Sequence, residues 1–257
     1  MRWIPFRHDR ASAPAEGAMP LVAHLAELRR RLVVALIAIG IGMLIAFFLY
    51  NRTLDFLVKP YCDVKREFQP GSNCRLVVTD PLESFSIRLK LAGYLGLLFA
   101  SPVVLWQLWR FITPGLYERE KRYAVPFVFS SIVLFLLGGG LAIATFPKTL
   151  DFFARFGGSD LELLYTPGKY LGLLVMMMLI FGLGFEFPVI LVFLEVAGIL
   201  SWRQLAAWRR YAIVGIFAVD AVITPSGDPV TLLAMAIPMV LFYEASILIG
   251  RFALRRS

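Results

Sequence analysis

The sequence predicts an all-α protein that crosses a membrane several times as one helical bundle. Of its 257 residues, 59% are hydrophobic and only 17% are charged, whereas a soluble domain is about half apolar and a quarter charged. Several apolar runs approach or exceed the ~20 residues that cross a ~30 Å hydrocarbon core. The net charge of +8 does not indicate nucleic-acid binding, because no soluble basic face exists to carry it.

The chain is expected to consist of one membrane domain with two short polar ends. Residues 1–19 are polar and lack periodicity, which is typical of a disordered extension. Residues 20–252 form the membrane domain, and residues 253–257 form a tail. No cleaved signal peptide is expected, because the first apolar run begins only near Leu32 and no small-x-small cleavage site follows it.

The segment 20–32 (PLVAHLAELRRRL) predicts a short amphipathic helix that lies at a membrane surface and leads into the first span. At ~100° per residue, its four leucines fall within an arc of about 60°. Arg30 and Arg31 fit a cytoplasmic anchor. Glu27 points away from the leucines, and a lone carboxylate among three arginines adds nothing to anchoring, so we regard Glu27 as a functional candidate.

Six spans are expected, at about residues 32–50, 85–109, 123–146, 170–196, 211–223 and 230–249. The fifth has only 13 residues, about 20 Å of helix, so a re-entrant or core helix is the alternative. We keep it as a span because the turn at 224–229 (TPSGDP) must face water. The bilayer can thin locally around a helix that is too short to cross it. No internal repeat is visible, unlike in many secondary transporters.

The distribution of basic residues predicts that both termini lie in the cytoplasm. With the N-terminus inside, the inner segments contain 16 of the 26 Lys and Arg residues, in short and strongly positive loops. The outer segments contain the other 10, together with acidic residues that nearly neutralise them. This asymmetry follows the positive-inside rule.

The outer segment 51–81 is expected to be a loop, and it contains both cysteines, Cys62 and Cys74. Two cysteines in one loop on the oxidising side of a membrane are candidates for a disulfide. Two independent free thiols are the alternative.

Three acidic residues lie inside apolar runs: Glu186, Asp220 and Glu244. An ionised side chain at mid-bilayer costs ~2.5–3.5 kcal/mol on insertion scales, so such residues are functional candidates. Glu186 is the strongest, because two glycines precede it and Pro188 follows it, which allows a locally polar notch in the helix. The alternative is a protonated or internally hydrogen-bonded glutamate that only fixes packing.

The segment 109–122 (WRFITPGLYEREKR) is too short to be anything but a loop between two spans. Most of its charges fit a positive-inside loop, but Glu120 is not needed for topology. Because a carboxylate accepts a guanidinium through two parallel bonds, we expect Glu120 and Glu27 to form a docking surface for an arginine-bearing peptide.

Four motifs resemble those of the TatC family, the multispanning subunits of the twin-arginine protein translocase. They are HLAELRRRL (24–32), SPVVLWQLWRFITPGLYEREKR (101–122), FEFPV (185–189) and TPSGDP followed by AIPM (236–239). The resemblance covers residues 20–252 in order, with matching topology. It implies a concave bundle of six transmembrane helices in a bacterial cytoplasmic membrane, with both termini cytoplasmic.

The resemblance also implies functional residues and partners. The positions that bind the paired arginines of a signal peptide match Glu27 and Glu120, and the neighbouring motif positions match Arg29, Phe111, Pro114, Leu116 and Arg122. Positions in or near the membrane, expected to contact polar groups of partners, match Glu186, Asp228, Pro60 and Pro102. The turn TPSGDP has one residue more than the family motif before Asp228.

The implied function is binding of folded precursors through their twin-arginine signal peptides and organisation of the translocation complex. The implied partners are single-span TatA- and TatB-like subunits and further copies of the chain, with energy from the proton-motive force and no cofactor. No enzyme activity or metal is expected, because the chain has two histidines and no metal-ligand cluster, phosphate loop or catalytic triad. An ion-coupled transporter that uses the intramembrane carboxylates is the alternative.

Overall fold

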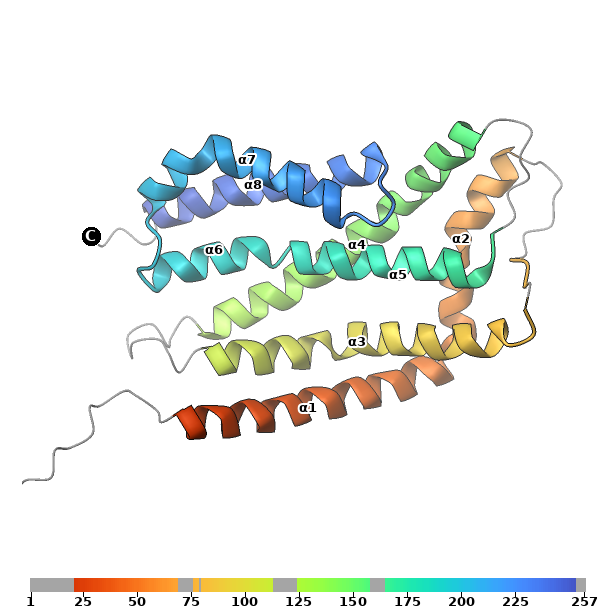
Figure 1. The fold of residues 1–257 in the computed structure, drawn as a ribbon, viewed down its shortest axis with the longest axis horizontal. Coiled ribbons are helices and arrows are strands. Elements are labelled where there is room, and N and C mark those ends of the chain that lie inside the picture. Colours follow the sequence, from red (N-terminus) through yellow and green to blue (C-terminus); the bar gives the residue numbers. More distant parts are fainter. Residues whose placement is uncertain (1–20, 69–75, 79, 113–123, 158–164, 253–257) are drawn as a thin grey trace, which may run out of the picture.

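The computed structural model describes residues 21–68, 76–78, 80–112, 124–157 and 165–252, which form helices and no strand (Figure 1). The helices are α1 (Leu21–Phe48), α2 (Tyr50–Phe68), α3 (Glu83–Ile112), α4 (Ala124–Gly157), α5 (Pro167–Gly184), α6 (Phe187–Val196), α7 (Trp202–Ile223) and α8 (Pro229–Phe252). The predicted fold class, an all-α membrane protein, is confirmed.

Five segments of the described chain are long and apolar enough to cross a membrane: α1, α3, α4, α5 together with α6, and α8. The predicted fifth span lies in α7, which is not among them because arginines and Asp220 interrupt its apolar part. The prediction of a 13-residue helix is nevertheless wrong. α7 has 22 residues, about 33 Å at 1.5 Å each, because Ser201 caps its start: the Ser201 hydroxyl accepts from the Gln204 N–H at 3.3 Å.

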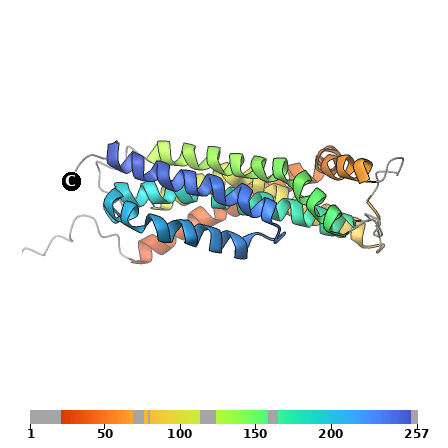
Figure 2. The same cartoon turned by 90° about the horizontal axis from the view of Figure 1, so that it is seen from above.

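The helices pack side by side, with α1 and α7 on the outside of the bundle (Figures 1 and 2). α1 lies chiefly against α3, and α7 lies chiefly against α8. α4 crosses the bundle obliquely and contacts α5 most extensively. The start of α1 and the end of α8 lie at the same end of the bundle (Figure 1), which we call the Glu27 end. We call the opposite end, where α2 lies, the Cys62 end.

Pro102 and Pro188 are two of the prolines that interrupt hydrogen bonding inside the membrane segments. Pro102 lies within α3 and leaves the Leu98 carbonyl without its helical donor, but the Ser101 hydroxyl donates to that carbonyl at 2.7 Å. Pro188 follows a break at residues 185–186 that divides the predicted fourth span into α5 and α6. The break places Glu186 at the junction of the two helices.

The prediction of a loop over 51–81 is wrong for its first part, because residues 50–68 form α2. Leu57, Tyr61 and Val64 repeat at helical spacing and are buried against the bundle. The Tyr170 hydroxyl fixes α2 to α5 by donating to the Leu57 carbonyl at 2.7 Å. The charged residues on the exposed face of α2 obscured this apolar stripe in the sequence, and the stripe includes the buried Pro60.

Cys62 is disulfide-bonded. Cys74 lies outside the described residues, so the pairing of the two cysteines stays a prediction.

Candidate binding surface and buried polar network

Glu27 lies on the second turn of α1, at the Glu27 end of the bundle, and is half-buried. The sequence suggested that its carboxylate is isolated among the arginines, but in the structure it is paired. Arg31, one turn later, donates from Nε to Glu27 Oε1 at 3.0 Å, and its Nη2 also contacts this oxygen. Glu27 therefore also has a local structural role, since an i,i+4 pair of this order supports a helix. Arg29 is exposed.

α3 brings Phe111 to the same end of the bundle as Glu27. The two helices run antiparallel and pack along their length (Figure 1), so the last turn of α3 lies near the first turns of α1. α4 also begins at this end. Glu120, together with Pro114, Leu116 and Arg122, lies in the segment between α3 and α4, outside the described residues.

Glu186 lies inside the bundle, 7% exposed, and is hydrogen-bonded. The Ser131 hydroxyl of α4 donates to Glu186 Oε2. The indole N–H of Trp109 in α3 donates to Ser131 Oγ at 2.6 Å. Glu186 Oε1 has no partner within the described chain. This geometry agrees with an internally hydrogen-bonded glutamate, which was the alternative that the sequence left open. The Ser131 hydroxyl links α3, α4 and the junction of α5 and α6.

Aromatic side chains enclose the Trp109 end of this network. The Trp109 ring stacks on Phe127 with centroids 5.4 Å apart, and Phe193 contacts both rings edge-on at 5.3 and 5.9 Å. These pairs join α3, α4 and α6. The network was missed in the sequence because a pair of serines in an apolar run has no periodic signal. Since Trp109 lies two residues before Phe111, the network holds the end of α3 from which the 113–123 segment departs.

Asp228 immediately precedes α8 and is 1% exposed. Its Oδ1 accepts from the Thr231 N–H at 2.8 Å, and its Oδ2 accepts from the Thr231 hydroxyl at 2.6 Å. The two hydroxyls of Thr231 and Thr149 are 2.7 Å apart, which joins α8 to α4. The carboxylate therefore caps α8 and fixes its start to α4.

Replacement of Asp228 by alanine is expected to lower the free energy of unfolding by about 2–3 kcal/mol. A lost N-cap costs about 1 kcal/mol, and the buried Thr231 hydroxyl loses its acceptor. Thermal unfolding in detergent would measure the effect. Ser226→Ala is the matched control, because the nearby Ser226 hydroxyl has no partner within the described chain. An equal loss of stability in the two variants would contradict the assignment.

Four further acidic groups lie apart from one another. Asp220 is fully buried in α7, and neither of its oxygens has a partner within the described chain. Glu195 of α6 packs against Gly250 of α8, also without a hydrogen-bond partner there. Glu244 pairs with Arg209 at 2.7 Å, and Asp151 pairs with Arg155. Across the described chain no three His, Cys, Asp or Glu residues group as metal ligands would.

These features define a multi-pass helical bundle in which Glu186 and Asp228 are buried and hydrogen-bonded between helices. A family model described as "Sec-independent protein translocase protein (TatC)" matches residues 23–238. The chain belongs to the TatC family, and it is therefore a subunit of the twin-arginine protein translocase, a non-enzymatic multi-pass protein of the bacterial membrane.

Individual relatives and solved structures agree with this assignment. The Sec-independent protein translocase protein TatC of Frankia casuarinae is 41% identical over 95% of this chain and 68% of its own length. The TatC protein of Aquifex aeolicus is 38% identical over 93% of this chain and 98% of its own. A crystal structure of the "Twin Arginine Translocase Receptor- TatC" is 37% identical, with a TM-score of 0.71, and covers 90% of this chain and 100% of that chain.

Proposed function

We propose that the chain binds twin-arginine signal peptides of folded precursors at the Glu27 end, which faces the cytoplasm together with both termini. The observation that carries this proposal is the antiparallel packing of α1 on α3 (Figure 1). Because α3 ends and α4 begins where α1 begins, the segment that contains Glu120 starts and finishes at the same end as Glu27. Two carboxylates at one end of the bundle suit two adjacent guanidinium groups.

The strength of the arginine contacts can be bounded. Charge-assisted hydrogen bonds contribute ~1.5–3 kcal/mol each, so two pairs contribute ~3–6 kcal/mol, which corresponds to a Kd between millimolar and tens of micromolar. Tighter binding requires burial of the apolar part of the signal. An incoming arginine must share Glu27 with Arg31 or displace Arg31 from it. Arginine is favoured over lysine in this competition, because a guanidinium can donate two parallel hydrogen bonds to one carboxylate.

The remaining motif residues are proposed to contact the signal, to shape the helices or to contact a partner helix. Phe111 at the end of α3 and Arg29 on α1 are proposed to contact the signal, along with three residues that lie outside the described chain: Pro114, Leu116 and Arg122. Pro60 and Pro102 are proposed to act through the shapes of α2 and α3. For Glu186 and Asp228 we propose contact with polar groups of a partner helix, and for Glu186 this role rests on its second oxygen, Oε1.

Membership of the translocase implies partners in the membrane. We propose that these are TatA- and TatB-like single-span subunits and further copies of this chain, and that the proton-motive force drives transport. The exposed apolar faces of the outer helices α1 and α7, for example Leu36 and Val214 at 56% and 69% exposure, leave room for lipid or partner helices on both sides of the bundle.

The double variant Glu27→Gln/Glu120→Gln is expected to reduce crosslinking of a twin-arginine peptide by at least tenfold, because it removes both charged acceptors. Photo-crosslinking to the detergent-solubilised protein would measure this, with a Lys-Lys peptide as the second ligand. Glu67→Gln is the control, since Glu67 is an exposed carboxylate on α2 at the Cys62 end. Crosslinking that persists in the double variant, or that falls equally in the control, would overturn the proposal.

A further inference from the structure

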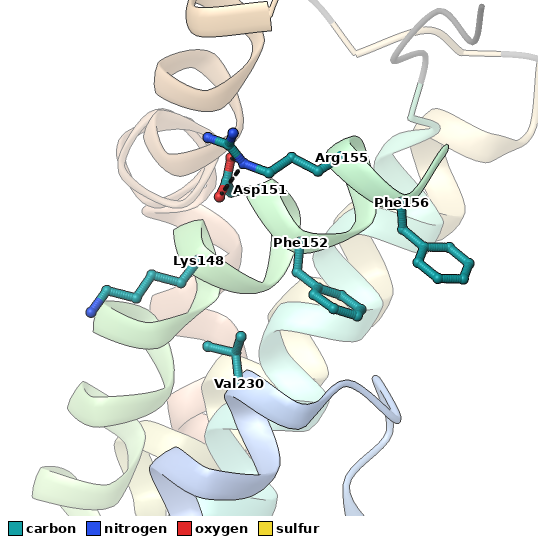
Figure 3. A pocket seen from close by; sticks show the side chains of 6 residues that line it. All are labelled: Lys148, Asp151, Phe152, Arg155, Phe156 and Val230. Carbon is teal, nitrogen blue, oxygen red and sulfur yellow. Dashed lines mark hydrogen bonds and ion pairs between the residues drawn. The ribbon is translucent and has the colours of Figure 1, made fainter. Parts of the chain in front are cut away.

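A cavity of about 540 Å³ lies at the Cys62 end, between the last turns of α4 and the start of α8. Figure 3 shows the residues that line it: Lys148, Asp151, Phe152, Arg155, Phe156 and Val230. None of them belongs to the proposed peptide-binding surface or to the buried network of Glu186.

The cavity has a charged side and an apolar side. At ~100° per residue, the three charged residues occupy one part of the α4 surface, and Phe152 and Phe156 occupy the adjoining part. In Figure 3 the charged side chains extend to one side of α4 and the two phenyl rings to the other, with Val230 of α8 between them. A ligand that fills the cavity must therefore itself be amphiphilic.

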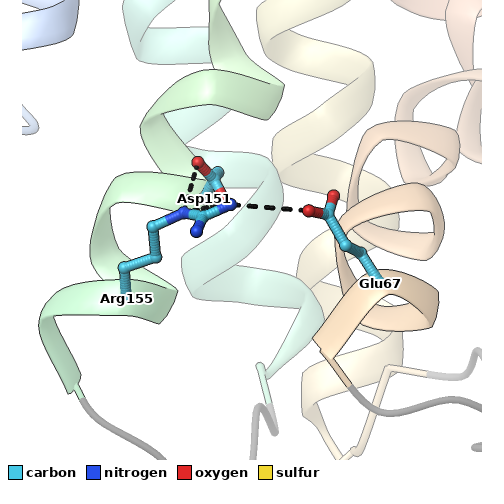
Figure 4. A network of polar contacts seen from close by, with 3 residues as sticks. All are labelled: Glu67, Asp151 and Arg155. Atoms are coloured by element: carbon cyan, nitrogen blue, oxygen red, sulfur yellow. Dashed lines mark hydrogen bonds and ion pairs between the residues drawn. The ribbon is translucent and has the colours of Figure 1, made fainter.

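The charged side presents one ammonium group, that of Lys148, which makes no ion pair within the described chain. Arg155 is held by Asp151, with Nε 2.9 and 3.0 Å from its two oxygens, and by Glu67 of α2 at 3.4 Å (Figure 4). Lys148 makes no ion pair with any residue that the structure describes. The charge available to a ligand at the cavity is therefore the Lys148 ammonium group, which suits an anion.

The cavity lies at the level of lipid headgroups. The apolar segment of α4 has 33 residues, about 50 Å along its oblique axis, which is well beyond the ~30 Å of the hydrocarbon core. The last turns of α4 consequently reach the headgroup region, while Val230 is only the second residue of the spanning helix α8. Phe156 is 83% exposed there, and aromatic side chains are favourable at this boundary.

We propose that this cavity binds one anionic phospholipid. The lipid phosphate accepts hydrogen bonds from Lys148 Nζ, and the glycerol and first acyl methylenes lie on Phe152, Phe156 and Val230. Free phosphate would leave the aromatic side without a partner, and a purely apolar peptide would leave the ammonium group without an anion. An anionic lipid satisfies both the ammonium group and the aromatic side, which neither free phosphate nor an apolar peptide does.

Titration of the purified full-length protein with phosphatidylglycerol, followed by native mass spectrometry, would test the proposal. Lys148→Gln is expected to weaken phosphatidylglycerol binding about fivefold, because one basic residue near an anionic lipid surface changes affinity by about this factor. Phe156→Ala is expected to weaken both phosphatidylglycerol and phosphatidylcholine without changing the melting temperature, because the ring is exposed in the absence of lipid.

Lys59→Gln provides the matched control, because Lys59 is an exposed lysine of α2 outside the cavity. Equal weakening by Lys148→Gln and Lys59→Gln would reveal a general charge effect and overturn the site. Displacement of phosphatidylglycerol by inorganic phosphate alone would also overturn it, since it would indicate a free-anion site. The Glu27→Gln/Glu120→Gln variant should retain lipid binding. A failure of the lipid proposal can therefore be distinguished from a failure of the proposed peptide binding.

Discussion

Replacing Gly42 by leucine is expected to separate α1 from α3 and to lower the free energy of unfolding by about 3 kcal/mol, the upper end of the usual cost of overpacking. A Cβ atom on Gly42 would lie 2.4 Å from the carbonyl oxygen of Gly96. A Cβ on Gly96 would in turn lie 2.6 Å from the backbone nitrogen of Met43. The two backbones touch at this point, as small residues allow between membrane helices, and neither can move aside as a flexible side chain would.

Gly40→Leu is the matched control, since Gly40 lies half a turn away on the same helix, where an added Cβ would meet no neighbouring atom of the described chain within 4 Å. Thermal unfolding of both variants in detergent would compare them. Similar melting temperatures for the two variants would contradict the close-approach explanation. Because α1 packs chiefly on α3, only Gly42→Leu should also reduce crosslinking of a twin-arginine peptide, through displacement of Glu27 from the end of α3.

The membrane helices were predictable because an apolar segment of sufficient length has few alternatives to crossing the bilayer as a helix. The boundaries of α3 and α8 differ from the predicted ones by at most three residues at each end. Prediction failed where two signals were superimposed. In α2 the apolar stripe at Leu57 and Tyr61 is interleaved with charged residues, and in α7 the helix begins within a polar segment that Ser201 caps.

The candidate site was predictable only in the choice of its residues. Glu27 and Glu186 were identified because a carboxylate in a basic or apolar setting is unexpected. Their partners, Arg31 and Ser131, could not be identified in the same way, since several arginines lie near Glu27 and a hydroxyl in an apolar run gives no pattern. Contacts such as Ser131 with Glu186, 55 residues apart, depend on how α4 crosses the break between α5 and α6.

Replacement of Ser131 by alanine is expected to destabilise the protein by about 2–4 kcal/mol, because each buried polar group that loses its hydrogen-bond partner costs about 1–3 kcal/mol. The fully buried Ser131 hydroxyl both donates to Glu186 and accepts from the Trp109 indole. Its removal takes a donor from the Glu186 carboxylate and an acceptor from the Trp109 N–H group at once. Ser130→Ala is the control, because Ser130 is the half-buried neighbour on the same helix and should change stability by less than about 0.5 kcal/mol.

A double-mutant cycle with Glu186→Leu separates this explanation from simple loss of packing. If the unpaired carboxylate is the main cost, Ser131→Ala should be less harmful when Glu186 is already leucine, with a coupling of about 1–3 kcal/mol in the free energy of unfolding. Additive effects would show that Ser131 and Glu186 do not interact. Since Trp109 precedes Phe111 by half a turn, Ser131→Ala should also weaken binding of a twin-arginine peptide, whereas Ser130→Ala should not. The glutamate in the membrane would then affect recognition at the Glu27 end through the position of α3, without contacting the peptide.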